Sequence, residues 1–189
     1  MKQLILTHKH AIGPAALPHA RSMADKLRSA GNQQVYLLVA DPAMATQMAA
    51  EDLAQNPADS DEFAYATMGS EHSSPEEANH VFLFDVLPNF LAWLKPDLVL
   101  VVDPALVGWN TVRSVRKALP GVPLEALVTC DETPLLGNAL ENSIVHRTLL
   151  EGALGQFETI RVYPACLSAF NNRHGRSMAC KPAVAEPMP

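Results

Sequence analysis

The densest group of reactive side chains follows the apolar stretch that begins at Leu124. Five successive residues there carry two hydroxyls, a thiol and two carboxylates: Thr129, Cys130, Asp131, Glu132 and Thr133. A carboxylate in such a group can remove a proton from a reacting hydroxyl or accept hydrogen bonds from a sugar. We predict Asp131 as a catalytic residue and Glu132 and Thr133 as substrate-binding residues. Because the two neighbouring carboxylates disfavour a thiolate, Cys130 is expected to be a buried, inert thiol.

A second group of polar residues follows the first apolar stretch, Gln3 to Thr7. The loop that comes next, HKHAIGP, places two imidazoles, an ammonium group and a glycine before a predicted helix. Since the N–H groups of a helix N-terminus attract anions, we predict that this loop binds an anionic group or a sugar. The residues concerned are His8, Lys9, His10 and Gly13. The alternative is an ordinary solvated loop. Two histidines one residue apart are a poor metal pair, and we predict no metal site.

A third candidate region contains Asp103 and Trp109, which follow a strongly apolar stretch. The Asp103 carboxylate can bind a substrate hydroxyl, and the Trp109 ring can provide an aromatic platform. The alternative is that Asp103 only ends a strand and Trp109 packs in the core. Neither the GxGxxG pattern of dinucleotide sites nor the GxxxxGK[ST] pattern of phosphate loops occurs in the sequence, so no cofactor is expected.

Apolar and polar patterning predicts the elements that must position these residues. Short apolar runs predict six strands, near residues 3–7, 35–40, 62–68, 97–103, 124–129 and 159–163. Helical spacing predicts helices near residues 17–30, 43–55, 74–94 with a kink at Pro88, 109–119 and 143–154, and a short one ending near Gly175. This alternation predicts a Rossmann-like three-layer α/β/α sandwich with a mainly parallel sheet of about six strands. Ligands bind such sheets at the carboxyl ends of the strands, where all three candidate regions fall.

Composition limits the classes of partner. The 189 residues include 14 Lys and Arg against 20 Asp and Glu, for a net charge of −6. This balance disfavours a sequence-independent grip on nucleic acid, which requires clustered positive charge. The apolar stretches are too short for a membrane span, so none is expected. Three cysteines without a CxxC pair indicate a reducing, cytoplasmic setting. Oligomerisation remains open.

The domain organisation is predicted to be simple. Residues 1–176 should form one Rossmann-like domain. The last nine residues contain three prolines, so we expect them to extend neither a helix nor a sheet. Residues 177–189 are therefore predicted to form a flexible tail or linker.

Three segments resemble the N-terminal, acceptor-side domain of glycosyltransferases with the GT-B fold. KPDLVLVVD at 95–103 is similar to a strand of that family, ALVTCD at 126–131 to its strand ending in His-Asp, and VYPACLS at 162–168 to its last N-domain strand and helix. The chain departs from the family in having only Gly13 where a paired-glycine loop is common, and Cys130 where the histidine stands. The resemblance implies a sugar or glycan acceptor and transfer of the hexosyltransferase type.

In that family a second domain holds the nucleotide-sugar donor, and this chain ends before such a domain would begin. The resemblance therefore implies that transfer needs a donor-binding domain or subunit in addition. The alternative hypothesis is a non-catalytic Rossmann-like protein that binds a small molecule or serves in assembly through an apolar helix face.

Overall fold

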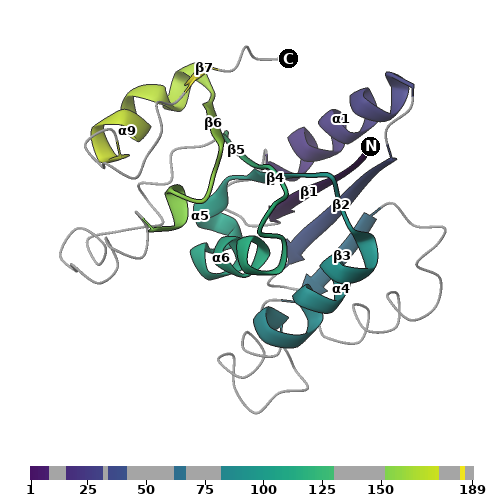
Figure 1. Cartoon of the computed structure of the whole chain (residues 1–189). Coiled ribbons are helices and arrows are strands. Elements are labelled where there is room, and N and C mark those ends of the chain that lie inside the picture. The colour runs from purple at the N-terminus through teal and green to yellow at the C-terminus, as the bar shows by residue number, and fades with distance from the viewer. Residues whose placement is uncertain are drawn as a thin grey trace.

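Parallel strands form the centre of the molecule (Figure 1). The computed structural model describes residues 1–8, 16–31, 34–41, 62–66, 82–129, 152–174 and 184–185. Within these ranges, seven strands pair in the order β3-β2-β1-β4-β5-β6-β7, and every pairing is parallel. Their bounds are β1 Lys2–His8, β2 Gln34–Asp41, β3 Glu62–Ala66, β4 Leu98–Val102, β5 Leu124–Val128, β6 Thr159–Val162 and β7 Val184–Ala185.

Burial explains why the central strands are apolar along their whole length. Leu4, Ile5 and Leu6 of β1 are fully buried, and residues 99–102 of β4 are at most 3% exposed. A parallel sheet covered on both faces requires such continuous apolar runs, because neither face meets water. The six predicted strands correspond to β1 through β6, so the predicted α/β fold class is confirmed.

Helices cover both faces of this sheet. α1, Ala16–Ser29, lies on one face, over β1 and β2, while α4, Leu87–Leu94, and α6, Trp109–Ala118, lie on the other (Figure 1). α9, Pro164–His174, follows β6. The helices predicted at 17–30 and 109–119 are confirmed, as is the one predicted to end near Gly175. The predicted helix at 43–55, and residues 143–151 of another, lie outside the described residues.

The helical segment that precedes β4 in the chain changes type along its length. A π-helix, η1, spans Phe82–Val86 and continues directly as α4. Pro88 is the second residue of α4, and in this first turn its missing N–H costs no hydrogen bond within α4. α4 is then capped at Lys95, whose N–H donates to the carbonyl oxygen of Leu91 at 2.9 Å. The predicted end before Lys95-Pro96 is confirmed, since Leu94 is the last residue of α4, and residues 74–81 lie outside the described residues.

Two short elements differ from the sequence-based expectations. The one-turn helix α5, Pro104–Val107, occupies a segment where no element was predicted. β7 also contradicts the expectation that residues 181–189 extend no sheet, since Val184 pairs with Arg161 of β6. Pro182 and Pro187 flank β7 rather than interrupt it, so neither removes a hydrogen bond from its two residues.

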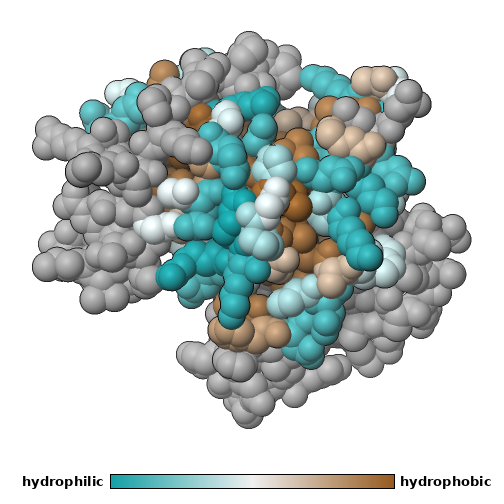
Figure 2. Space-filling view, in the orientation of Figure 1, coloured by the Kyte–Doolittle hydropathy of each residue, from teal (hydrophilic) through white to brown (hydrophobic). Residues whose placement is uncertain are grey.

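Polar side chains cover much of the outer surface. Figure 2 shows hydrophilic residues over large parts of one side of the molecule, with hydrophobic residues visible between them near the middle. In the described part of the chain, the most exposed large hydrophobic side chains are, in descending order, those of Phe84, Met1 and Trp93. None of the described helices is both long and apolar enough to cross a membrane.

Candidate functional site

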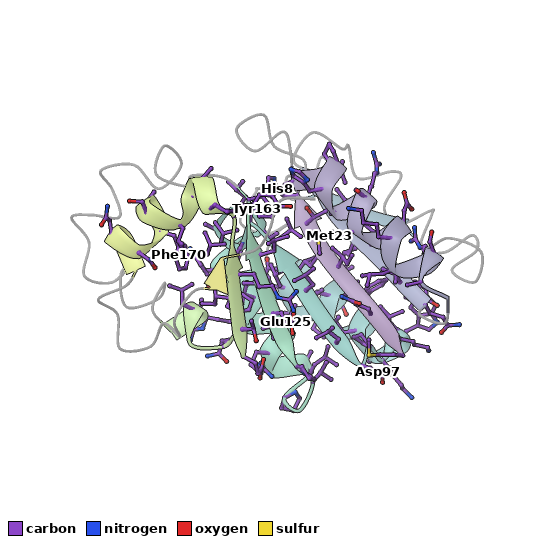
Figure 3. The ribbon with its side chains drawn as sticks, turned by 90° about the horizontal axis from the view of Figure 1, so that it is seen from above. His8, Met23, Asp97, Glu125, Tyr163 and Phe170 are labelled. Atoms are coloured by element: carbon purple, nitrogen blue, oxygen red, sulfur yellow. The ribbon has the colours of Figure 1, made fainter. Side chains whose placement is uncertain are left out.

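The carboxyl ends of β1, β4 and β5 bring three polar residues to one edge of the sheet. β1 ends at His8, Asp103 follows β4, and Thr129 follows β5. Leu6 pairs with Val101, so His8 and Asp103 lie two residues further along neighbouring strands. Figure 3 shows His8 and Tyr163 near this edge, with Asp97 at the opposite one. In open parallel sheets this is the edge at which ligands bind.

The Asp103 carboxylate is fully buried and held by Thr129. Its Oδ1 accepts a hydrogen bond from the Thr129 N–H at 2.6 Å, and its Oδ2 accepts one from the Thr129 hydroxyl, also at 2.6 Å. Hydrogen bonds to a charged carboxylate are shorter and stronger than neutral ones. The two donors therefore fix the plane of the carboxylate.

The backbone of Asp103 is equally constrained. Its φ of 50° and ψ of 68° are left-handed, a conformation that a side chain with a Cβ disfavours. Its N–H donates to the carbonyl oxygen of Leu127 at 2.7 Å, and its own carbonyl accepts from Leu106 at 2.9 Å and Val107 at 3.2 Å. α5 thus begins on Asp103, and this turn aims the side chain along the edge of the sheet.

His8 is fully buried beside this carboxylate. Its Nε2 lies 3.6 Å from Oδ2 of Asp103, which is ion-pair distance and slightly too long for a hydrogen bond. A carboxylate next to an imidazole orients the ring and stabilises the imidazolium formed when the ring takes a proton. Such contacts are often long until a substrate binds. The pair has the composition of a general base and its orienting group.

Within the described ranges, two further polar atoms at this edge have no hydrogen-bond partner. They are the hydroxyl of Thr7, a fully buried residue, and the indole Nε1 of Trp109, the first residue of α6. Gly108, with φ 103°, makes the turn that separates α5 from α6 and so sets where Trp109 starts. Buried polar groups normally form hydrogen bonds. Each of these two atoms could therefore form a hydrogen bond with a ligand without breaking one that the described residues already make.

An aromatic contact connects α1 to the same edge. The ring of His19, in the first turns of α1, meets the ring of Tyr163 edge to face, with centroids 5.4 Å apart. Tyr163 directly follows β6 and is 5% exposed. The N-terminal part of α1 therefore contacts the residue that directly follows β6.

Three of the predicted site residues are described by the structure. It brings His8 and Asp103 together, and it places Trp109 after α5, one turn beyond Asp103. The remaining predicted site residues lie outside the described residues: Lys9, His10, Gly13, Asp131, Glu132 and Thr133. Thr129 was not predicted, although a hydroxyl directly after β5, the neighbour of β4, was a usable signal. No group of three or more potential metal ligands occurs among the described residues.

Comparisons with known proteins agree with this architecture. No family model matches the sequence, and no curated protein matches it either. The structure is similar to a crystal structure of TcCGT1 in complex with UDP, with a TM-score of 0.50 and 10% sequence identity. The match covers 97% of this chain and 50% of that chain, so this chain spans about half the length of the protein it resembles. At this identity the likeness shows the fold, a Rossmann-like sheet like that of one domain of a GT-B glycosyltransferase.

Proposed function

We propose that this chain is a glycosyltransferase-like domain that binds a sugar or glycan acceptor at the carboxyl edge of β1, β4 and β5. The observation that carries the proposal is the buried His8–Asp103 pair, 3.6 Å apart at the edge where ligands bind such sheets. A carboxylate and an imidazole are costly to desolvate in that position, and an apolar pair of the same size would pack there at lower cost.

The chemistry that the pair supports is removal of a proton from an acceptor hydroxyl. As the acceptor oxygen forms its bond to the donor sugar carbon, its proton passes to the imidazole of His8 and the donor's leaving group departs with the bonding electrons. The negative charge of Asp103 stabilises the resulting imidazolium, as in other base–carboxylate pairs. General-base catalysis of this kind typically contributes about 10²–10⁴-fold to the rate.

The donor would be held by a second domain or subunit. The support for this is the length relation, since the match covers half of a chain crystallised with UDP. Residues predicted from sequence complete the proposed site, because all follow β1 or β5 by a few positions: Lys9, His10, Gly13, Asp131, Glu132 and Thr133. Asp131 remains the predicted catalytic carboxylate of the loop after β5.

A second candidate function is a non-catalytic binding or assembly protein. It is favoured by the exposed aromatic side chains of Phe84, 62% exposed, and Trp93, 47% exposed, on η1 and α4. Exposed aromatic residues of this kind are enriched in protein interfaces. Under this alternative the chain would self-associate, with a sedimentation coefficient that rises with concentration and falls in a Trp93→Ser variant.

Thermal-shift titration tests the acceptor site. The ligands are maltose, 4-nitrophenyl glucoside, UDP and UDP-glucose, and the proteins are the wild type, His8→Gln and the matched control His19→Gln, whose ring contacts Tyr163 instead. An acceptor at ten times its Kd should raise the melting temperature by about 3–6 °C. The shift should persist in His19→Gln and disappear in His8→Gln.

Two outcomes would contradict the proposal. If no acceptor stabilises the protein, or if His8→Gln responds as the wild type does, the site is wrongly assigned. Stabilisation by UDP-glucose without acceptor would show that this chain holds the donor itself, against the proposed division between two domains or subunits.

A further inference from the structure

Thr129 makes two contacts with the carboxylate that faces His8. Its N–H donates to Oδ1 of Asp103 and its hydroxyl donates to Oδ2, both at 2.6 Å. The N–H is fixed by the end of β5, whereas the hydroxyl belongs to a side chain that can be exchanged without altering the backbone. The two contacts can therefore be separated by substitution.

Oδ2 of Asp103 is the oxygen that joins the two interactions. It accepts the Thr129 hydroxyl and is also the atom 3.6 Å from Nε2 of His8. With the N–H contact alone, the carboxylate would be held at one point and could rotate about its last bond. The hydroxyl is the second point, and it keeps Oδ2 opposite the imidazole.

We propose that Thr129 is a positioning residue, whose hydroxyl holds Asp103 so that the Nε2–H of neutral His8 points at the carboxylate. The other ring nitrogen, Nδ1, then carries the lone pair of the base. This inference rests on the proposed function, because the orientation of His8 matters only if His8 takes a proton from a substrate.

The surroundings of Asp103 support a role beyond fastening β4 to β5. If the turn after β4 were the only requirement, glycine would adopt the left-handed backbone at position 103 without strain. Asp103 instead retains a strained backbone and a fully buried charge, and Thr129 supplies the donors that this charge needs.

NMR spectroscopy of the ligand-free chain tests the proposal. Histidine is labelled with ¹⁵N, and the His8 signals are identified by their loss in His8→Gln. The wild type and Thr129→Ser, which keeps the hydroxyl, should show the same ring ¹⁵N chemical shifts for His8. Thr129→Val has the same shape without the hydroxyl, and its His8 ring ¹⁵N signals should shift away from these values, because the carboxylate charge is no longer held opposite Nε2.

The variants separate positioning from simple fastening. A fastening role alone would lower the melting temperature of Thr129→Val without moving the His8 signal, and that result would overturn the proposal. So would a Thr129→Ser signal like that of Thr129→Val. Should Thr129→Val not fold, Thr129→Ala and Asp103→Asn serve in its place, and an unchanged His8 signal in either overturns the proposal.

Failure here is distinguishable from failure of the proposed function. The NMR measurement contains no ligand, so an unchanged His8 signal would remove the role of Thr129 only. An absence of acceptor-induced stabilisation would remove the acceptor site and leave the effect of Thr129 on His8 intact.

Discussion

The two edges of the sheet each carry a cluster of charged side chains, and the clusters are built differently. At the edge where β5 and β6 begin, Arg116 of α6 donates to the carbonyl oxygens of Val122 at 2.9 Å and Gln156 at 2.6 Å. It also contacts both carboxylate oxygens of Glu158, at 2.7 and 2.9 Å. Glu158 in turn accepts the N–H of Leu124 at 2.6 Å. This Arg116–Glu158 cluster joins a helix end to the starts of two strands.

Exposure separates this cluster from the buried pair at the carboxyl edge. The side chains of Arg116 and Glu158 are 17% and 48% exposed, whereas His8 and Asp103 are 0% exposed. Partial exposure keeps the desolvation cost of the Arg116–Glu158 pair small. Its many hydrogen bonds indicate that it stabilises the junction between the helix and the two strands. The buried pair bears a larger desolvation cost at a longer distance. Fold stability therefore accounts for the Arg116–Glu158 cluster. It does not account for the buried His8–Asp103 pair, which is better explained by a functional role.

The largest stability effect should come from removing the buried carboxylate. Asp103→Ala leaves the N–H and hydroxyl of Thr129 without their acceptor, and should lower the free energy of unfolding by about 3 kcal/mol. Asp103→Asn, which retains one acceptor, should lose less. Urea unfolding of both variants gives the values. A loss below about 1 kcal/mol in Asp103→Ala would erase the contrast between a buried and an exposed cluster.

An intermediate effect is expected at the other edge. Arg116→Ala removes donors from two carbonyl oxygens and from Glu158, and should cost about 1–2 kcal/mol in the same unfolding measurement. Its response to acceptor ligands should remain that of the wild type, because the cluster lies at the opposite edge. Arg116→Lys keeps the charge but not the forked geometry of the guanidinium. Its free energy of unfolding should therefore lie between those of the wild type and Arg116→Ala. Loss of the acceptor response in Arg116→Ala would show that the two edges are coupled.

The smallest effect should be a pH dependence from Glu158. Burial raises the pKa of Glu158, but the Leu124 N–H, its own backbone N–H and the Arg116 guanidinium together hold the pKa below its ordinary value of 4.5. A carboxyl whose pKa is lowered by folding stabilises the protein fully above its unfolded pKa and loses that contribution as pH falls through the folded value. Because Glu158 is half exposed, the contribution should be about 0.2–1 kcal/mol.

The variant Glu158→Gln isolates this contribution. It should be less stable than the wild type at neutral pH, and the difference should vanish once the pH is well below 4.5. Melting temperatures measured across this range give the comparison. A difference that stays constant with pH would mean that the charge of Glu158 plays no part.

Most of the sheet was predictable from the sequence because buried parallel strands are apolar throughout. The run at 98–102, preceded by Pro96 and followed by Asp103, illustrates a pattern that only a covered strand requires. β7 was missed because two residues, Val184 and Ala185, are too few for any periodicity. α5 was missed because four residues between Asp103 and Gly108 resemble a loop.

The candidate site was predictable residue by residue but not as a pair. His8 and Asp103 were both identified because each follows an apolar run, where ligands bind. Their contact depends on β1 lying beside β4, on the register of that pairing and on the left-handed backbone of Asp103. None of these three is written in local patterning. The contact with Thr129 depends in the same way on β5 lying beside β4.

The left-handed backbone of Asp103 also sets how this site would disappear over generations. Aspartate becomes glycine through a single base change, and glycine at φ 50° would relieve about 1–2 kcal/mol of backbone strain, which partly offsets the hydrogen bonds lost at Thr129. Lys95 also has a φ of 50°, but a change to glycine at that position would remove no carboxylate. Descendants that kept this fold without the proposed proton transfer would therefore be recognisable by a glycine at position 103.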